Sequence, residues 1–386
     1  MRILHTSDWH LGRTLHGISL HEDQEDALKQ VVCELENEYD AVLIAGDIYD
    51  RAVPPKEAVK LLEWFFLTLE KLKVKTVIIP GNHDSATRLG FASGLLERSG
   101  VHLRCDYARL GEPVALKSKQ GQQVDVFALP FVDAPYMSEA LGDDSISNHA
   151  GATEAAVRLM REARREEVPA ILMAHAFVGE NLKTSESERI FIGGAHVVGA
   201  DVFEGFDYVS LGHLHRPQKV GVDHIRYSGS LLPYSFSEAG HKKQMLRLEF
   251  DGPGAPHVQP VAIEPLHRVA VIEDDFESVL KESRYDELEQ CYLSVRLNDD
   301  KYLINTFRRL KARFPNLLEL RQIHLEATED RNGSSAAGGA ETPLEIVELF
   351  LDYFGWESGS KEREASVGII EGIMRELDAR DREALS

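Results

Sequence analysis

The sequence is poor in cysteine, in long apolar runs and in positive charge, and each shortage excludes a class of protein. Three cysteines occur among 386 residues, far apart at Cys33, Cys105 and Cys291. This number and spacing fit neither a disulfide framework nor a thiolate metal site, so we expect reduced cysteines. No run of about 18 apolar residues is present, which excludes a transmembrane helix. Residues 1–8 also lack the apolar stretch of a signal peptide. We therefore expect a cytoplasmic protein with no membrane attachment.

Positive charge is the second shortage. Lysine and arginine number 43 against 64 aspartates and glutamates, which gives a net charge of −21. Affinity for duplex DNA comes largely from neutralising phosphates with Lys and Arg, so this charge argues against a simple DNA-binding module. A nucleic-acid role would need local cations, bound metals or a basic partner. The chain is 43% hydrophobic and 28% charged, as expected for a globular protein, and its length predicts two or three domains.

Short aliphatic segments alternate with helical stretches over the first 250 residues, which predicts an α/β layered core. The expected strands are 2–6, 41–45, 76–79, 124–129, 170–174, 208–211, 227–232 and 244–250. The expected helices are 23–38, 56–72 and 153–166. We assign residues 1–262 to this first domain.

The pattern changes after Pro253-Gly254-Ala255-Pro256. Expected strands at 268–272, 292–297 and 318–324, with a helix at 301–314, predict a small α+β capping domain over 263–328. Residues 329–342 are rich in Gly, Ser and Ala and predict a flexible linker. Residues 343–386 contain two amphipathic helices and predict a C-terminal helical tail. This tail either packs back on its own chain or docks onto a partner protein, which we favour.

Five clusters of histidine and carboxylate lie in order along the first 215 residues, most of them at the end of an expected strand. They are Asp8-Trp9-His10, Gly46-Asp47-Ile48-Tyr49-Asp50, Gly81-Asn82-His83-Asp84, His175 and Gly212-His213-Leu214-His215. Asp8 and His10 are two residues apart, the spacing at which side chains of a strand point to one side. Loops at the carboxyl ends of strands are where α/β sheets usually hold ligands. We therefore expect all five clusters to meet at one edge.

These clusters predict a centre with two metal ions. Imidazole, carboxylate and amide ligands without thiolate suit Mn²⁺, Fe²⁺ or Zn²⁺. Seven candidate ligands are too many for one ion with an open position, and suit two ions about 3.5–4 Å apart. They are Asp8, His10, Asp47, Asn82, His175, His213 and His215. Asp47 is the natural bridge, because a carboxylate has two oxygens. A lone Asp-x-His or a lone histidine is more often structural, so the prediction depends on all five clusters together.

With these motifs, the sequence resembles the calcineurin-like metallophosphoesterase superfamily over about residues 1–250. The stretches 6–12, 46–50, 212–216 and 229–236 resemble the SbcD family of bacterial nuclease subunits in particular. The resemblance implies a four-layer β-sandwich flanked by helices. It also implies that one ion takes Asp8, His10, His215 and Asp47, and that the other takes Asp47, Asn82, His175 and His213.

The resemblance further implies that His83 is the catalytic histidine and acts on the phosphate or the leaving oxygen. Asp50 matches the carboxylate that orients this histidine in phosphatases of the superfamily, although some nucleases carry a histidine there. Asp84 is a candidate to support the ligands from behind. Arg13, Arg51 and Arg216 adjoin the motifs and either grip phosphates or form surface ion pairs.

The implied activity is manganese-dependent hydrolysis of DNA phosphodiesters, with Mg²⁺ or Fe²⁺ as alternatives to Mn²⁺. In this family the nuclease pairs with an SMC-type ATPase, SbcC. The pair acts as an ATP-dependent double-strand exonuclease and a single-strand and hairpin endonuclease in DNA repair, recombination and replication. The tail would bind the ATPase, and the chain would form a homodimer through helices near the site. Trp64, Phe65 and Phe66 lie on such a helix, but burial in the core explains them equally well.

Three other functions remain open at this point. The cluster Gly46–Arg51 also resembles that of phosphoprotein phosphatases, although those usually have glutamate where Asp84 stands. A cyclic-nucleotide phosphodiesterase would use the same metals. A non-catalytic scaffold for the ATPase would tolerate decayed motifs, whereas here all seven candidate ligands and His83 are present.

Overall fold

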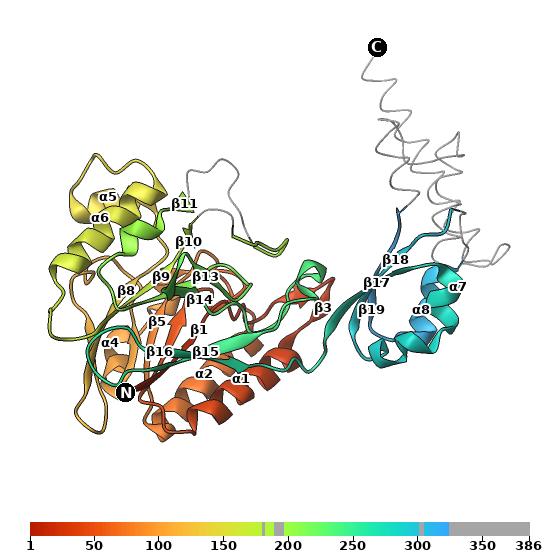
Figure 1. The fold of residues 1–386 in the computed structure, drawn as a ribbon, viewed down its shortest axis with the longest axis horizontal. Helices are drawn as coiled ribbons and strands as arrows, with labels where there is room; N and C mark the ends of the chain where they lie inside the picture. The colour runs from red at the N-terminus through yellow and green to blue at the C-terminus, as the bar shows by residue number, and fades with distance from the viewer. Residues whose placement is uncertain (180–181, 189–196, 301–304, 324–386) are drawn as a thin grey trace, which may run out of the picture. The chain divides into compact units, whose positions relative to one another are not determined.

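The computed structural model describes residues 1–179, 182–188, 197–300 and 305–323 (Figure 1). Its contacts divide the chain into two units, Met1–Arg268 and Val269–Ser386, and each is described by itself. The linker and helical tail predicted over 329–386 lie outside the described residues. No helix in the described part of the chain is long and apolar enough to cross a membrane.

The first unit contains two six-stranded sheets. The first sheet has the strand order β16-β15-β1-β4-β5-β6, in which β1, β4, β5 and β6 are parallel. Its strands are β1 (Arg2–Thr6), β4 (Ala41–Ala45), β5 (Lys75–Ile79), β6 (Val101–Leu103), β15 (Gln244–Glu249) and β16 (His257–Ala262). The central strands are short aliphatic runs that are buried along nearly their whole length, as expected of parallel strands covered on both faces.

The second sheet has the order β13-β14-β12-β9-β8-β7, with β14, β12, β9 and β8 parallel. Its strands are β7 (Val114–Lys117), β8 (Gln123–Leu129), β9 (Ala170–His175), β12 (Tyr208–Gly212), β13 (Gln218–Val220) and β14 (Val222–Tyr227). The edge strands β7 and β13 run antiparallel to their neighbours. Parallel strands need crossover connections, and the helices of the unit lie in several of them.

The two sheets pack face to face, and helices cover their outer faces (Figure 1). An apolar cluster that includes Ile3, Leu43, Val126, Ile171 and Leu248 joins β1, β4 and β15 of one sheet to β8 and β9 of the other. A second cluster packs α6 against the outer face of β8 and β9. The longer helices are α1 (His21–Leu35), α2 (Lys56–Leu72), α5 (Ala134–Leu141) and α6 (His149–Glu162). This arrangement confirms the predicted fold class of a four-layer α/β sandwich.

Short elements complete the first unit. They are β2 (Thr14–Leu15), β3 (Ile18–Ser19), α3 (Ala86–Leu89), α4 (Ser93–Leu96), β10 (Phe177–Val178) and β11 (Val197–Val198), with 3-10 turns at Glu97–Ser99, Ala200–Phe203 and Phe236–Glu238.

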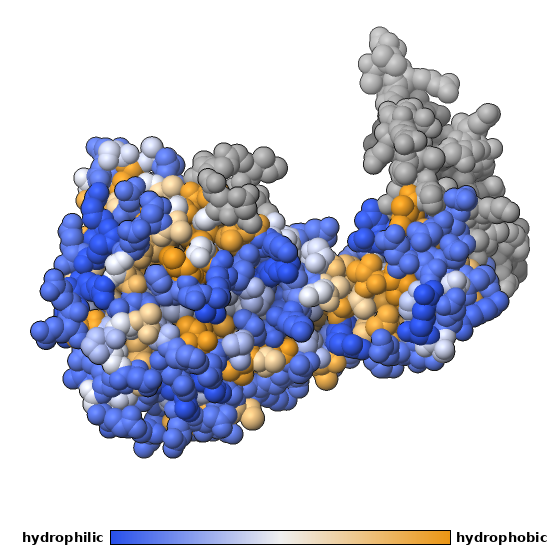
Figure 2. Space-filling view, viewed as in Figure 1, coloured by the Kyte–Doolittle hydropathy of each residue, from blue (hydrophilic) through white to orange (hydrophobic). Residues whose placement is uncertain are grey.

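The second unit, over its described residues, is a three-stranded parallel sheet with helices in its crossovers. In chain order it contains β17 (Val269–Asp274), α7 (Phe276–Lys281), a 3-10 turn (Ser283–Leu288), β18 (Tyr292–Leu297), α8 (Thr306–Arg313) and β19 (Leu317–Gln322). Ile272, Val295, Leu310 and Phe314 belong to its apolar core. On the surface drawn in Figure 2, polar residues cover much of the described part of both units, and apolar residues appear in smaller groups.

Most strands predicted from aliphatic runs end within one or two residues of the prediction. One was wrong: the strand expected at 227–232 is β14, which ends at Tyr227, and the residues after it form a loop. This loop carries Ser228 and Ser230, whose buried hydroxyls bond to Ser7 and Lys243 near the site. The helix expected at 301–314 is shorter at Thr306–Arg313, and residues 301–304 lie outside the described residues.

Candidate metal centre

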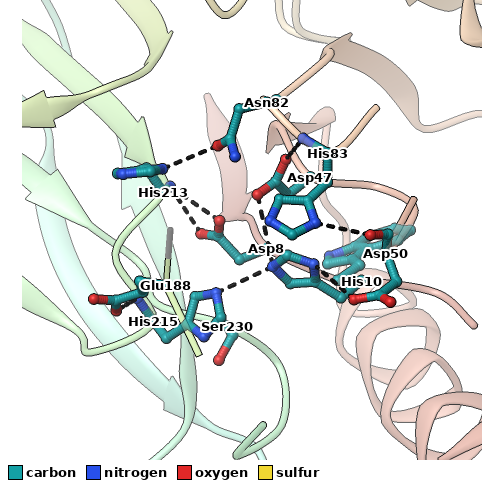
Figure 3. A network of polar contacts seen from close by, with 12 residues as sticks. Asp8, His10, Asp47, Asp50, Asn82, His83, Glu188, His213, His215 and Ser230 are labelled. Carbon is teal, nitrogen blue, oxygen red and sulfur yellow. Dashed lines mark hydrogen bonds and ion pairs between the residues drawn. The ribbon is translucent and has the colours of Figure 1, made fainter. Parts of the chain in front are cut away.

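Four of the five clusters meet where the carboxyl ends of β1, β4 and β5 in the first sheet face that of β12 in the second (Figure 3). The fifth, His175 at the end of β9, joins them through contacts with Asn82 and Asp47. The Nδ1 atom of His175, at the end of β9, donates to the carbonyl oxygen of Ala45, at the end of β4, over 2.9 Å. This bond joins the two sheets beneath the site. Among the described residues, three groups of side chains have possible ligand atoms within 4.8 Å of one another: Asp8, His10 and His215; Asp8, Asp47 and His175; and His10, Asp50 and His83.

Four of the candidate ligands lie in strained turns, whereas His175 is the last residue of strand β9. Asp8, His10, Asp47 and His213 all have positive φ angles, of 53°, 45°, 51° and 105°. Asp8 and His10 do follow the predicted end of β1 at Thr6, but the strand spacing used to predict that they share a side does not apply, because both have turn conformations. Their loops are held by main-chain bonds from Asp8 to Gly46 (3.0 Å) and from His10 to Asp47 (2.9 Å). The side chains converge because the two loops are joined to each other.

Three hydrogen-bond acceptors gather around His175. Its Nδ1–H is used on Ala45, so in the neutral ring its Nε2 has only a lone pair. This Nε2 lies 3.1 Å from Asn82 Oδ1 and 3.3 Å from Asp47 Oδ2. Burial lowers the pKa of His175, but the Asp47 and Asp8 carboxylates outweigh burial and raise it to about 9. Burial would raise the pKa of Asp47, but His175 and His10 outweigh burial and hold it well below its usual range. The point between these atoms therefore favours a positive charge.

His10 and His215 face each other through a ring nitrogen of each. Their Nε2 atoms are 3.1 Å apart, and His10 Nε2 is also 3.6 Å from Asp47 Oδ2. Burial lowers the pKa of His10 to about 4, so the ring is neutral near pH 7. Its Nδ1 atom is buried with no hydrogen-bond partner among the described residues, and its nearest charged neighbour is Asp50 Oδ1 at 3.6 Å.

His213 and Asp8 complete the set. The main-chain N–H of His213 donates to Asp8 Oδ1 over 2.9 Å, and the Ser7 hydroxyl donates to Asp8 Oδ2 over 2.5 Å. The ring Nδ1 of His213 lies 3.1 Å from Asn82 Oδ1. Burial, and then the neighbouring His175, lower the pKa of His213 to about 3. All seven predicted ligands thus lie in one place, with imidazole nitrogens and carboxylate and amide oxygens facing common points.

His83 lies beside this set, and its orientation differs from the expectation. Its Nδ1 bonds the main-chain oxygen of Asp50 over 2.7 Å, and its main-chain N–H donates to Asp47 Oδ1 over 2.9 Å. The expectation that the Asp50 carboxylate orients His83 is therefore corrected, because the main chain of residue 50 makes the contact. The Asp50 carboxylate instead accepts from Arg13 over 2.9 Å and faces His10. Because a carbonyl only accepts, His83 keeps its proton on Nδ1 and leaves Nε2 for another group.

Asp84 supports the two loops of the first sheet that carry Asp47 and Asn82. Its carboxylate accepts from the main-chain N–H groups of Ile48 (3.0 Å), Tyr49 (2.9 Å) and Gly81 (2.9 Å). Burial and the Asp47 carboxylate raise the pKa of Asp84 to about 7 in spite of these bonds. The prediction that Asp84 stands behind the ligands agrees with this position.

The motifs did not reveal a group of charged side chains behind His215. Glu188 Oε1 accepts from the main-chain N–H of His215 over 2.6 Å, and Glu238 Oε1 lies 3.2 Å from the ring Nδ1. Lys243 pairs with Glu238, and both side chains are fully buried. The sequence held one signal for Glu238, which comes two residues after the stretch 229–236. Lys243 and Glu188 stand in no motif, and only the fold brings them to the site.

The residues fit a pair of divalent cations. When the His175 ring is neutral, its Nε2, Asn82 Oδ1 and Asp47 Oδ2 are three acceptor atoms that face one another. The Nε2 atoms of His10 and His215 face each other over 3.1 Å. Imidazole nitrogens with carboxylate and amide oxygens are donors that suit Mn²⁺, Fe²⁺ or Zn²⁺. The rings of His175 and His215 each have a second contact that fixes their orientation, as is usual for metal-binding histidines.

Comparison with known families agrees with this geometry. Residues 1–217 match the calcineurin-like phosphoesterase model, a family of hydrolases that use divalent metals. Residues 265–354 match the SbcD C-terminal model, described as the type 5 capsule protein repressor C-terminal domain. The first match covers more than half of the 386 residues and ends just after His215. The chain therefore belongs to the calcineurin-like phosphoesterase family, and its C-terminal part resembles the SbcD type.

Proposed function

We propose that the chain is a manganese-dependent DNA phosphodiesterase and the nuclease subunit of an SbcCD-like complex. The observation that carries the proposal is the convergence of seven ligand side chains beside His83, in a chain whose residues 265–354 match the SbcD C-terminal model. Phosphatases of the family share the cluster of ligands, whereas the match to the SbcD C-terminal model favours a nuclease.

In this proposal, one ion takes Asp8, His10, His215 and Asp47, and the other takes Asp47, Asn82, His175 and His213. The 3.1 Å separation of the His10 and His215 nitrogens supports the first set. The contacts of Asn82 Oδ1 with His175 and His213, both at 3.1 Å, support the second. Asp47 Oδ2 lies within 3.6 Å of both His10 and His175, which supports Asp47 as the residue that both ions would share.

A pair of divalent ions held there would polarise the phosphate and lower the pKa of water toward neutrality. The chain itself would hold and move protons at His83. Its Nδ1–H stays on the Asp50 carbonyl, so Nε2 is the atom directed to substrate. Protonated at Nε2, His83 would stabilise charge on the phosphate or protonate the departing sugar oxygen.

The contacts of three arginines suggest which of them grip DNA. Arg13 bonds to Asp50, lies over the Tyr234 ring and is 17% exposed, so its charge is already paired. Arg51 and Arg216 form no side-chain hydrogen bond or ion pair within the described ranges. We infer that these two contact the phosphate backbone near the site. Substituting either by glutamine should weaken binding of all DNA sequences and reduce the dependence of affinity on salt by about one unit of slope.

The first test is cleavage of linear, hairpin and single-stranded DNA with Mn²⁺, with EDTA, and with a phosphomonoester in place of DNA. The His83→Ala variant should retain two Mn²⁺ ions and lose cleavage by a factor of about 10²–10⁴, the range of general acid–base catalysis. His257→Ala, on an exposed position of β16, is the matched control and should cleave normally. Intact DNA with rapid turnover of the phosphomonoester would instead assign the chain to the phosphatases. Full cleavage by His83→Ala would overturn the role of this residue.

The partner proposal concerns residues 341–386, which lie outside the described residues. We propose that this segment binds the coiled-coil base of SbcC, which would supply a basic DNA surface that a chain of net charge −21 lacks. Deleting it should abolish co-purification with the ATPase and leave manganese-dependent cleavage of single strands. Binding that persists after the deletion would contradict the assignment.

We also propose a homodimer. Phe65 is fully buried and belongs to the core, whereas Val59 and Leu67 on α2 are 45% and 56% exposed. Phe91, just before α4, is 82% exposed, and Leu95, in α4, is 66% exposed. Replacing Leu67 and Phe91 by glutamate should convert the dimer to a monomer in sedimentation experiments, and an unchanged mass would place the interface elsewhere.

A further inference from the structure

The carboxylate of Glu238 is enclosed behind the ring of His215. Its exposed fraction is zero, and it lies in the 3-10 turn Phe236–Glu238. Oε1 accepts from the hydroxyls of Ser185 (3.2 Å) and Ser187, and lies 3.2 Å from Nδ1 of His215. Ser187 Oγ is itself 2.7 Å from the same Nδ1. The carboxylate therefore has several hydrogen-bond partners, and one of them is the ring of a candidate metal ligand.

Lys243 supplies the charge that such a buried carboxylate needs. Its ammonium bonds to Glu238 Oε2, to the main-chain oxygen of His215 (3.0 Å) and to Ser230 Oγ (2.8 Å). Three donors thus meet three acceptors, and no water is needed to satisfy them. Burial alone would raise the pKa of Glu238, but Lys243 and His215 hold it well below its usual range. The buried ammonium of Lys243 is thus the counter-charge of the buried Glu238 carboxylate.

We propose that Glu238 is a positioning residue for the ion at Asp8, His10 and His215. The Glu238 carboxylate accepts from Ser187, whose oxygen is then free to accept from Nδ1, and together they would keep the proton on Nδ1. The lone pair of Nε2 would then be available to the ion and more basic. Lys243 fixes Glu238 in this position. The inference rests on the proposed two-metal function and deepens it.

The other histidines of the site show why the effect should be selective. His175 donates its Nδ1–H to a neutral carbonyl, that of Ala45. His10 has only a carboxylate at 3.6 Å, and this carboxylate is shared with Arg13. Among the candidate ligands in the described part of the chain, His215 alone has a fully buried carboxylate, that of Glu238, within 3.2 Å of Nδ1, the ring nitrogen that faces away from the ion site. Removing the charge of Glu238 should therefore weaken one of the two ions.

The test is titration of the metal-free chain with Mn²⁺, followed by calorimetry and by the Mn²⁺ electron paramagnetic resonance signal. Glu238→Gln should still bind two ions, with one of them about 10- to 100-fold weaker and the other unchanged. Because Glu238→Gln also leaves Lys243 without its counter-charge, it should unfold at a lower temperature than the wild type.

A double variant separates the two effects. Glu238→Gln with Lys243→Met removes both charges at similar volume, so the metal-free chain should regain thermal stability, while the weak ion stays weak. Glu34→Gln is the matched control, since it breaks another partly buried ion pair, with Arg247, far from the site. It should lower stability and leave both ions unchanged.

Two results would overturn the inference. One is wild-type affinity for both ions in Glu238→Gln. The other is recovery of affinity together with stability in the double variant, which would make Glu238 a folding residue only. A wild-type chain that fails to bind two Mn²⁺ ions would contradict the proposed function itself.

Discussion

Asp84 offers a quantitative test of how the site is held in place. Its carboxylate accepts three main-chain hydrogen bonds, from Ile48, Tyr49 and Gly81, and so fastens the Asp47 loop to the Asn82 loop. A hydrogen bond contributes about 0.5–1.5 kcal/mol net, and a buried N–H group left without its acceptor costs about 1–3 kcal/mol. The three bonds share one carboxylate and are not additive, so we expect Asp84→Ala to lower the free energy of unfolding by roughly 3–5 kcal/mol.

Asp84→Asn should have a smaller effect for a geometric reason. Oδ2 accepts from both Ile48 and Gly81, whereas Oδ1 accepts from Tyr49 alone. An asparagine whose oxygen takes the place of Oδ2 keeps two bonds and turns its NH₂ group toward the N–H of Tyr49. Because burial and Asp47 raise the pKa of Asp84 to about 7, the group is partly protonated near neutral pH, and the expected loss is one ordinary hydrogen bond, about 0.5–1.5 kcal/mol. The order wild type, Asn, Ala should therefore appear in urea unfolding measured in EDTA.

Metal affinity distinguishes support of the site from general stability. Asp84→Ala should weaken Mn²⁺ binding about 10- to 100-fold, because the two loops that carry ligands lose their connection. Asp207→Ala is the matched control. Its carboxylate also accepts a main-chain bond, from Ala170 over 2.8 Å, and pairs with Arg164, but it lies at the amino ends of β9 and β12. It should lower stability and leave Mn²⁺ affinity intact. Equal affinity in the wild type and Asp84→Ala would refute the reasoning.

Two further predictions concern Gly81 and His5. A Cβ atom at Gly81 would lie 2.1 Å from Asp47 Oδ1. Gly81→Ala should therefore displace Asp47 and abolish tight Mn²⁺ binding in calorimetry. Gly94 has open space around it, so the control variant Gly94→Ala should bind Mn²⁺ normally. His5 is buried, and burial lowers its pKa from 6.5 to about 3. Between these values only the unfolded chain holds the proton, so stability falls as the pH is lowered, by up to about 1.4 kcal/mol per pH unit from this group. His5→Gln should reduce the slope of unfolding free energy against pH between 6.5 and 5 in EDTA, and an unchanged slope would show that His5 titrates normally.

Burial explains which strands could be predicted from the sequence. Ala41–Ala45 and Tyr208–Gly212 are buried at every position and are bounded by polar residues, so their aliphatic runs mark their ends. The edge strand β16 (His257–Ala262) is half exposed and contains Pro260, and no such run reveals it. The direction of strands in the second unit was also beyond prediction, because β17, β18 and β19 are parallel only through the way their helices cross over.

The candidate site divides in a similar way. Residues that follow buried strands, such as Asp47 and His175, were predictable because strand ends are predictable. Glu238 and Lys243 were not predictable, because they belong to the site only through contacts with His215, which lies 23 and 28 residues earlier in the chain. A buried carboxylate and a buried lysine look like surface residues in a sequence, since charged side chains are rarely buried unless paired. Only the fold shows that Glu238 and Lys243 pair with each other, which allows both to be buried.

Backbone strain at the ligands indicates that the fold holds the centre ready before any metal arrives. Asp8, His10 and Asp47 are not glycine, yet all three have φ near 50°. Such a conformation costs about 1–3 kcal/mol at each residue and persists only where its surroundings enforce it. Here the main-chain bonds between the Asp8 and Asp47 loops do so. The ligand pair that looked like two positions on one strand is thus two positions on a turn. A turn can bring Asp8 and His10 toward the residues of the second sheet, whereas a continued strand would carry them past it.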